Sequence, residues 1–264
     1  VLLPGPLSLH EALATLAPTH VSLVATQLRR CLGDPAALAA LQRAKAILLG
    51  GSAFPEGLIA EAHAAGLPIH KSYGLTEMGS QVTTTRPGAP LEELHTSGYP
   101  LAPGMVRVSP EGEIEVQGET LFAGYYRADA APSLARPSTP EGWYPTGDLG
   151  RLDAEGRLIV LGRRDHMFIS GGENVHPEEV ERALAGIEGV EQALVVSLPD
   201  AEYGEIGVAF VAMPDWDEEA LRARLREVLP AYKVPKRFLR WPADAPAGGI
   251  KPSRAWFRAR AMGE

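Results

Sequence analysis

The first ninety residues alternate apolar runs with helical patterns, and this alternation limits the possible fold more than any other feature of the chain. Residues 20–25, 46–49 and 67–70 are short apolar runs. Helices are predicted between and around them, at residues 10–16, 35–45 and 55–65. Apolar strands separated by helices indicate a parallel sheet that is covered on both faces. Such sheets bind ligands at the carboxyl ends of their strands, where glycine-bearing turns occur in this sequence.

The pattern changes twice further along the chain. Residues 98–162 carry short alternating strands and a hairpin turn at residues 154–156, which predict a small antiparallel barrel or sheet. Residues 129–141 contain three prolines and are predicted to be an exposed loop. After Arg164, helices and strands alternate again in a compact α+β unit. Its helices are predicted at residues 177–185, 217–228 and 253–262, and its strands at residues 192–197, 207–213 and 237–241.

These patterns together predict an α/β protein of two domains. Residues 1–97 are expected to be α/β and residues 98–164 β-rich, both within one large domain, and residues 165–264 form a smaller C-terminal α+β domain. A chain of 264 residues has the length at which a second hydrophobic core becomes favoured. The boundary is placed between Arg164 and Asp165.

Composition excludes several classes of function. The formal net charge of -8, with no offsetting basic run, argues against a nucleic-acid partner. No apolar run approaches the roughly 18 residues that a membrane span needs, so no span is predicted. Cys31 is the single cysteine, which rules out an intramolecular disulfide and fits a reducing, cytoplasmic location. A homodimer stays open.

The segment Tyr73-Gly74-Leu75-Thr76-Glu77 follows a predicted strand and carries groups suited to a nucleotide. The Thr76 hydroxyl can donate a hydrogen bond to a phosphate oxygen, and Glu77 offers a hard oxygen ligand for Mg²⁺. The same residues also fit a simple strand-to-helix turn with Thr76 as its cap. Further along, Asp148 ends the run Thr146-Gly147-Asp148, and its carboxylate can accept both hydroxyl protons of a ribose.

A second informative segment runs from Gly162 to the predicted helix at residues 177–185. It joins an Arg-x-Asp turn at Arg163 to a glycine pair, Gly171-Gly172, and a helix opened by proline and acids. Helix chemistry accounts for the proline and acids. The glycines would let a ligand or another backbone come close.

In their order and spacing these segments resemble the motifs of the adenylate-forming enzymes, the acyl- and aryl-CoA ligases and their relatives. The resemblance implies a large AMP-binding domain followed by a mobile C-terminal domain that turns about Asp165. It also implies a set of nucleotide contacts: Gly50, Gly51 and Ser52 along the purine, Tyr73 and Gly74 beside the adenine, Thr76 at a phosphate, Glu77 at Mg²⁺, and Asp148 with Arg163 at the ribose.

The resemblance extends to the tail of the chain. Lys251, in Gly248-Gly249-Ile250-Lys251, matches the mobile catalytic lysine of the family, whose ammonium would bridge the acid's carboxylate and the α-phosphate. Gly171 and Gly172 match the loop that replaces this lysine when coenzyme A enters. The implied reactants are ATP with Mg²⁺, a small-molecule carboxylic acid and coenzyme A. Within the family, residues 20–28, 73–80, 168–181 and 248–254 are most similar to the ligases of o-succinylbenzoate in menaquinone synthesis, and another aryl or fatty acid is the alternative.

One departure from the family pattern is clear. No Gly-, Ser- and Thr-rich loop ending in Pro-Lys, which would hold the ATP β- and γ-phosphates, occurs in the sequence. The chain is therefore expected to be the C-terminal half of a longer ligase, and to be inactive in isolation. A non-catalytic nucleotide- or partner-binding fragment is the rival from another class. A Rossmann oxidoreductase fails because no Gly-x-Gly-x-x-Gly follows the early strands.

Overall fold

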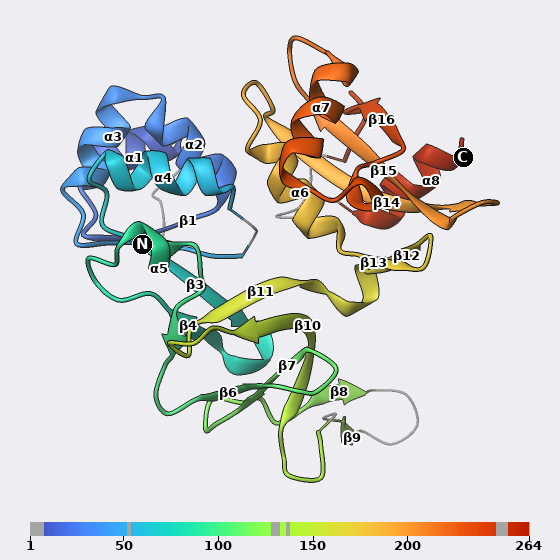
Figure 1. Ribbon diagram of the computed structural model, residues 1–264. Coiled ribbons are helices and arrows are strands. Elements are labelled where there is room, and N and C mark those ends of the chain that lie inside the picture. Colours follow the sequence, from blue (N-terminus) through green and yellow to red (C-terminus); the bar gives the residue numbers. More distant parts are fainter. Residues whose placement is uncertain (1–7, 52–53, 128–132, 136–137, 247–252, 264) are drawn as a thin grey trace. The chain divides into compact units, whose positions relative to one another are not determined.

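The computed structural model describes residues 8–51, 54–127, 133–135, 138–246 and 253–263 (Figure 1). The chain divides into two compact units, Val1–Val160 and Leu161–Glu264. This division falls shortly before the predicted boundary at Arg164 and Asp165, and rotation about that boundary stays a prediction.

The first unit begins with a five-stranded sheet in the order β1-β2-β3-β4-β5. Its strands are β1 (His20–Leu23), β2 (Ala46–Leu49), β3 (Ile69–Leu75), β4 (Ser80–Thr84) and β5 (Tyr99–Pro100). Its helices are α1 (Leu9–Leu16), α2 (Ala25–Leu32), α3 (Pro35–Gln42), α4 (Glu56–Ala64) and α5 (Leu91–Leu94). Ser8 and Asp34 cap α1 and α3 with their side chains, which satisfies backbone N–H groups that would otherwise lack partners.

The three strands predicted to form a parallel sheet do so, and the sheet continues with two antiparallel strands that were not predicted. Strands β1, β2 and β3 are parallel, but β3 pairs with β4, and β4 with β5, in antiparallel fashion. The cause is the short 3-10 helix η1 (Thr76–Met78), followed by Gly79 at φ 77°, which reverses the chain without a crossover helix. The segment with Thr76 and Glu77 therefore lies in a tight reversal between two strands, and not at the start of an α-helix.

The β-rich part of the first unit contains a four-stranded sheet in the order β11-β10-β7-β6 and a separate hairpin, β8-β9. Its strands are β6 (Met105–Val108), β7 (Glu113–Gln117), β8 (Tyr125–Arg127), β9 (Ser133–Ala135), β10 (Tyr144–Leu152) and β11 (Leu158–Arg163), of which residues 161–163 already belong to the second unit. The predicted loop at residues 129–141 is wrong in part, because β9 lies within it. The three prolines flank residues 133–135 and do not interrupt them, so these residues can pair with β8.

The second unit is a five-stranded sheet in the order β13-β12-β15-β14, with β16 also paired to β15. Its strands are β12 (Phe168–Ser170), β13 (Glu173–Val175), β14 (Gln192–Asp200), β15 (Gly204–Ala212) and β16 (Arg237–Arg240). Its helices are α6 (Pro177–Ala185), α7 (Glu218–Val228), α8 (Arg254–Met262) and the 3-10 helices η2 (Arg164–His166) and η3 (Ala231–Lys233). One apolar cluster includes Val180 of α6 and Leu221 of α7, and another includes Phe257 of α8.

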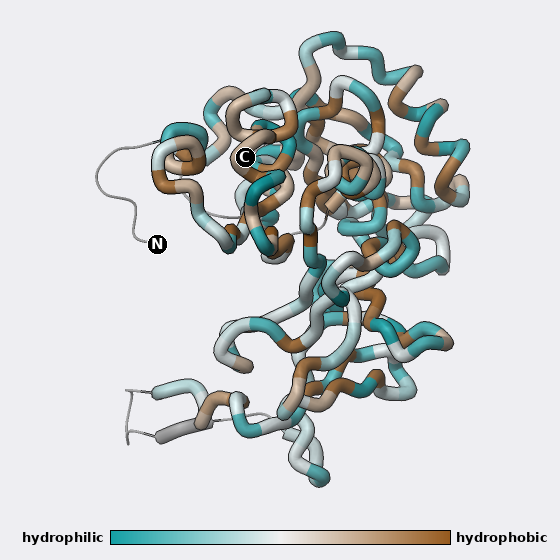
Figure 2. The backbone as a smooth tube through the Cα atoms, turned by 90° about the vertical axis from the view of Figure 1, so that its left-hand side faces the viewer, coloured by the Kyte–Doolittle hydropathy of each residue, from teal (hydrophilic) through white to brown (hydrophobic). Residues whose placement is uncertain are grey.

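Coloured by hydropathy, the chain shows apolar stretches that are short and interrupted by polar ones (Figure 2). Among the described residues, no helix is long and apolar enough to cross a membrane.

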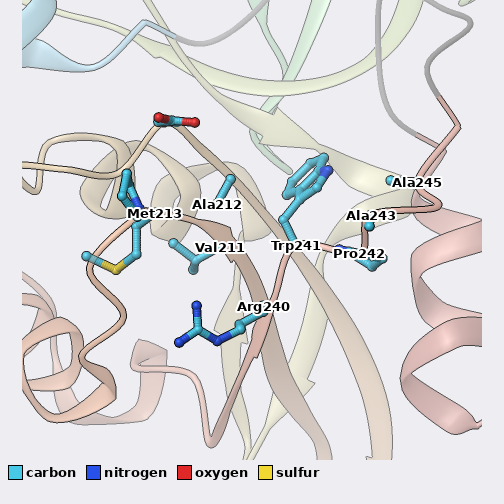
Figure 3. A pocket seen from close by; sticks show the side chains of 10 residues that line it. Val211, Ala212, Met213, Arg240, Trp241, Pro242, Ala243 and Ala245 are labelled. Atoms are coloured by element: carbon cyan, nitrogen blue, oxygen red, sulfur yellow. The ribbon is translucent and has the colours of Figure 1, made fainter.

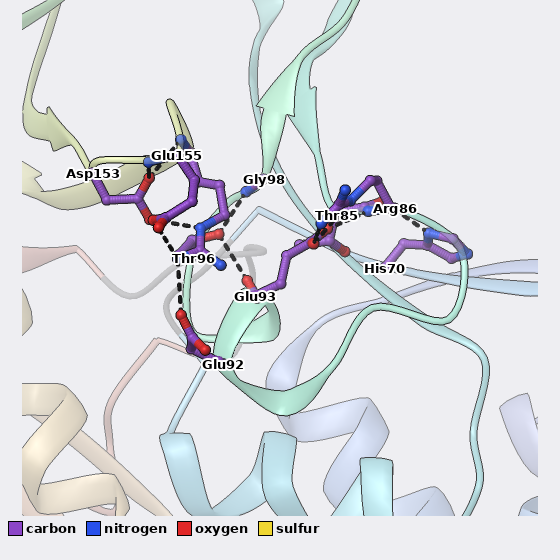
Figure 4. A network of polar contacts seen from close by, with 10 residues as sticks. His70, Thr85, Arg86, Glu92, Glu93, Thr96, Gly98, Asp153 and Glu155 are labelled. Atoms are coloured by element: carbon purple, nitrogen blue, oxygen red, sulfur yellow. Dashed lines mark hydrogen bonds and ion pairs between the residues drawn. The ribbon is translucent and has the colours of Figure 1, made fainter.

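A buried carboxylate organises the polar contacts around α5 (Figure 4). The Glu93 side chain is 0% exposed in the fold and accepts hydrogen bonds from Arg86, including one of 2.6 Å from Nη2. Burial raises the pKa of the Glu93 carboxyl, but the hydrogen bonds and charge of Arg86 lower it more, so the pKa lies below its ordinary value. Ionised Glu93 therefore stabilises the fold above the unfolded-state pKa of about 4.3, and this contribution is lost as the pH falls through the lower folded-state pKa.

Replacing Glu93 with glutamine is expected to lower the free energy of unfolding by about 1–3 kcal/mol at pH 7, because charge-assisted hydrogen bonds are lost. The deficit should shrink as the pH falls below the unfolded-state pKa of about 4.3, and it should vanish once the pH has fallen through the lower folded-state pKa of Glu93. Urea unfolding, followed by circular dichroism at pH 7 and at acidic pH, measures this difference in the free energy of unfolding. Glu92→Gln is the matched control, since the Glu92 side chain is 80% exposed. Equal effects of the two substitutions would contradict a special role for the buried carboxylate.

Candidate nucleotide site

Two of the predicted site residues are in direct contact in the first unit. Tyr73, on β3, donates a hydrogen bond of 2.7 Å from its hydroxyl to Oδ2 of Asp148, on β10. The Tyr73 ring is buried in the apolar cluster that also contains Met78 and Tyr144. The contact joins the segment predicted to lie beside the adenine to the carboxylate predicted to hold the ribose.

Local hydrogen bonds hold the turn that presents Asp148. The Thr146 hydroxyl donates 2.8 Å to the carbonyl of Ile114, and its oxygen accepts from the Asp148 N–H at 3.1 Å. The Gly147 N–H donates 2.9 Å to the buried Glu113 carboxylate. The pairing of β10 with β7 shifts register at this point, as in a β-bulge, which re-aims side chains in an otherwise regular strand. Hydrogen bonds to β7 therefore hold Thr146-Gly147-Asp148 in place at this irregularity of β10.

Gly74 has a structural reason that is independent of any ligand. A Cβ atom at this position would lie 2.2 Å from the backbone oxygen of Ser80, because β4 folds back closely against β3. No side chain fits there. The tight approach places Thr76 and Glu77 at the tip of the reversal, where Thr76 is exposed and Glu77 partly exposed.

The glycine turn at the end of β2 lies next to the same strand. A Cβ atom on Gly50 would lie 2.9 Å from Oγ of Ser72, the residue before Tyr73, whereas a Cβ atom on Gly51 would meet nothing within 4 Å. The predicted purine segment therefore begins beside β3. Its third member, Ser52, lies outside the described residues.

Glu77 is held by a group that the sequence motifs do not include. The Tyr125 hydroxyl donates to Oε1 of Glu77 and lies 3.0 Å from the Tyr144 hydroxyl. Tyr144 lies in the same apolar cluster as Tyr73, which bonds Asp148, so these contacts connect Glu77, Tyr73 and Asp148 in one cluster of the first unit. Tyr125 was missed because its partners lie on distant segments, and no spacing in the sequence reveals such contacts.

The remaining predicted residues belong to the second unit. Arg163 donates 3.0 Å from Nε to Oδ1 of Asp165, and this hydrogen bond lowers the pKa of the Asp165 carboxyl. Asp165 lies in η2 with its side chain 65% exposed. Arg163 and Asp148 belong to different units, so their joint contact with a ribose stays a prediction. Lys251 lies outside the described residues.

The glycine pair of the second unit has a clear conformational cause. Gly171 and Gly172 have φ values of 60° and 88°, and they connect the paired residues Ser170 and Glu173 of β12 and β13. A two-residue hairpin with both central residues at positive φ is the turn for which glycine is strongly preferred. The hairpin alone explains these glycines, and their predicted role toward coenzyme A is a separate claim.

A pocket of about 490 Å³ lies at one edge of the second unit, between the ends of β15 and β16 (Figure 3). Met213, Arg240 and Trp241 are among its lining residues, and none of the predicted site residues is. It therefore does not belong to the nucleotide site.

The described residues include no group of three or more His, Cys, Asp or Glu side chains that could hold a metal ion. Mg²⁺ is usually bound through one or two carboxylates together with substrate phosphates and water, and Glu77 offers one such carboxylate. The metal role of Glu77 stays a prediction.

The fold and these segments define an AMP-binding protein of the adenylate-forming class. Residues 1–126 match the AMP-binding enzyme family and residues 179–246 match the AMP-binding enzyme C-terminal domain, and the chain belongs to this family.

Among curated relatives, the 2-succinylbenzoate--CoA ligase of Listeria monocytogenes is 37% identical over 194 residues, 73% of this chain and 41% of the relative. The ligase of the same name from Bacillus licheniformis is 36% identical over 236 residues, 86% of this chain and 47% of the relative. The chain thus spans about half the length of the curated relatives that it matches.

Solved structures agree with these matches. A variant of E. coli MenE with bound OSB-AMS has a TM-score of 0.81 and 33% identity, over 97% of this chain and 53% of that one. The o-succinylbenzoate CoA synthetase (MenE) of Bacillus subtilis, in complex with the acyl-adenylate intermediate OSB-AMP, has a TM-score of 0.78 and 32% identity, over 91% and 51%. The fold prediction, an AMP-binding portion followed by a small α+β domain, is confirmed.

Proposed function

We propose that this chain is the C-terminal part of an AMP-forming CoA ligase that acts on o-succinylbenzoate. The observation that carries the proposal is the cluster of Tyr73, Glu77 and Asp148 in the first unit, which gathers an aromatic ring and two carboxylates from β3, η1 and β10. The curated relatives named for 2-succinylbenzoate, at 36–37% identity, support the choice of acid.

The reaction proceeds in two displacements. A carboxylate oxygen of the acid attacks the α-phosphorus of ATP, and the bond to the leaving pyrophosphate breaks. The thiol sulfur of coenzyme A then attacks the carbonyl carbon of the acyl-adenylate, and AMP leaves as the thioester forms. The first step supplies AMP as a leaving group. A free carboxylate has no such group, because attack on it would have to expel oxide.

Each site residue of this chain has a role that follows from its functional group. Asp148 accepts hydrogen bonds from the ribose hydroxyls, assisted by Arg163. Thr76 would donate to a phosphate oxygen, and Glu77 would hold the Mg²⁺, whose charge would offset that of the phosphates. Lys251 offsets the repulsion between the two anions during adenylation.

The proposal is tested on the complete gene product with a panel of acids, ATP, Mg²⁺ and coenzyme A. Formation of o-succinylbenzoyl-CoA at a kcat/KM well above that for benzoates and medium-chain fatty acids is expected. Turnover of fatty acids without turnover of o-succinylbenzoate would overturn the choice of acid but keep the ligase. Nucleotide binding without any thioester product would favour a non-catalytic role.

Replacing Asp165 with proline in the complete enzyme is expected to slow one half-reaction at least about tenfold more than the other. Proline fixes φ near −65°, whereas a hinge residue must absorb a large backbone change between two orientations. Acyl-adenylate formation and thioester formation from supplied acyl-adenylate are measured separately. Asp165→Ala, which removes the carboxylate but leaves φ mobile, is the control. Equal slowing of both half-reactions by Asp165→Pro would mean that Asp165 is not the hinge.

A further inference from the structure

Tyr125 contacts Glu77 from outside every motif that the sequence displays. It lies at the start of β8, and its side chain is 46% exposed. Because an ionised carboxylate can only accept, the Tyr125 hydroxyl must be the donor to Oε1 of Glu77. The Tyr144 hydroxyl, 3.0 Å away, then donates to the oxygen of Tyr125. Each hydrogen bond in this series therefore has a fixed donor: Tyr144 of β10 donates to Tyr125, and Tyr125 donates to Glu77.

The same segment also holds the backbone of Glu77. The Phe122 N–H donates 2.7 Å to the carbonyl of Glu77. The Phe122 ring packs edge-on against Tyr125 at 4.8 Å and against Tyr144 at 5.4 Å between centroids. Tyr125 is therefore fixed by aromatic packing as well as by its hydrogen bonds. An exposed surface tyrosine without such packing could not hold a partner in one position.

The hydrogen bond to the carboxylate favours the neutral form of the phenol. The side-chain hydrogen bond to Glu77, followed by that to Tyr144, raises the pKa of Tyr125 well above its ordinary value. Of the two Glu77 oxygens, Oε1 is engaged by Tyr125, while Oε2 has no hydrogen-bond partner among the described residues.

We propose that Tyr125 is a positioning residue, which holds Oε1 of Glu77 so that Oε2 is presented to the nucleotide-borne Mg²⁺. This inference depends on the proposed function, in which Glu77 ligates the metal. Groups that orient a metal ligand from behind commonly change metal affinity about 10- to 100-fold when they are removed.

The test uses the complete protein with Mn²⁺ as the probe, because electron paramagnetic resonance counts free Mn²⁺ directly. Tyr125→Phe removes only the hydroxyl and keeps the ring against Phe122. It should weaken Mn²⁺ binding to the ATP complex about tenfold, while ATP binding without metal stays unchanged. In adenylation assays, the Mg²⁺ concentration at half-maximal rate should rise by the same factor, with kcat at saturating Mg²⁺ nearly unchanged.

Tyr126→Phe is the matched control, since the neighbouring Tyr126 side chain is 69% exposed, and it should leave Mn²⁺ affinity unchanged. Glu77→Gln separates this inference from the proposed function. If Glu77→Gln leaves Mn²⁺ affinity intact, the metal role of Glu77 is wrong and the inference falls with it. If Glu77→Gln weakens binding but Tyr125→Phe does not, only the inference is overturned. If Tyr125→Phe weakens ATP binding equally with and without metal, Tyr125 has a structural role alone.

Discussion

Replacing Arg254 with methionine is expected to lower the free energy of unfolding of the second unit by about 3–5 kcal/mol, because it leaves a buried carboxylate without its counter-charge. Arg254 is the first residue of α8, and its guanidinium donates bidentate hydrogen bonds of 2.6 Å and 2.9 Å to the Glu181 carboxylate of α6. A third contact, of 3.1 Å, reaches Glu178. The side chains of Arg254 and Glu181 are only 21% and 16% exposed.

Arg254 and Glu181 also bind backbone groups at the edge strand β14 of the sheet. Strand β14 pairs with β15 on one side only, and both α6 and α8 contact this strand. The Val195 N–H donates 2.7 Å to Glu181, and its carbonyl accepts from Arg254 at 2.5 Å. The two side chains thus take the place of a neighbouring strand at this residue. A buried backbone group without such a partner would be costly.

The effect of Arg254→Met should depend on pH. Burial raises the pKa of the Glu181 carboxyl above its unfolded value, against the opposing attraction of Arg254. A group with a raised folded-state pKa stabilises the fold fully below its unfolded pKa and loses that contribution as the pH rises through the folded pKa. Without Arg254 that pKa rises further, so the variant should lose more stability at pH 8 than at pH 5.

Denaturant unfolding of the chain, followed by tryptophan fluorescence, measures this loss, because Trp216, Trp241 and Trp256 lie in the second unit. Arg258→Met, on the same helix, is the control. Its partner Glu205 is 3.8 Å away and Arg258 is 47% exposed, so less than about 1 kcal/mol is expected. The double variant Glu181→Leu, Arg254→Met should recover only part of the loss, because Val195 still lacks both partners. A loss for Arg254→Met no larger than the control's would refute this account.

Replacing Lys251 with alanine in the complete enzyme is expected to slow adenylation about 10²- to 10³-fold, the usual cost of removing one group that stabilises transition-state charge. Thioester formation from supplied acyl-adenylate should change less than about threefold, because that step builds no charge between the carboxylate and the α-phosphate. Exchange of pyrophosphate into ATP measures the first step, and direct assay of the thioester measures the second.

Lys45→Ala provides the control, since Lys45 is an exposed lysine of the first unit. It should leave both steps unchanged. If Lys251→Ala slowed both half-reactions alike in a folded protein, Lys251 would serve general binding, and the proposed alternation between two orientations would be wrong.

Local signals in the sequence were sufficient for several elements. Helix α6 begins at Pro177 and ends at Ala185 as predicted, because proline and acids at a helix start act within one turn of the chain. The residue types for binding a nucleotide, such as Thr76, Glu77 and Asp148, were also readable, since each belongs to a short motif. The role of each in catalysis stays a prediction.

Contacts between distant segments were decided only by the tertiary structure. The antiparallel pairing of β4 depends on how closely Ser80 approaches Gly74, and no apolar pattern encodes that approach. The contact of Tyr73 with Asp148 joins residues 75 positions apart, and Tyr125 meets Glu77 across 48 positions. Sequence by itself determined which chemical groups were present and where helices could start, because those depend on neighbours along the chain. Which groups share one site depends on the packing of strands, and only the folded chain decides it.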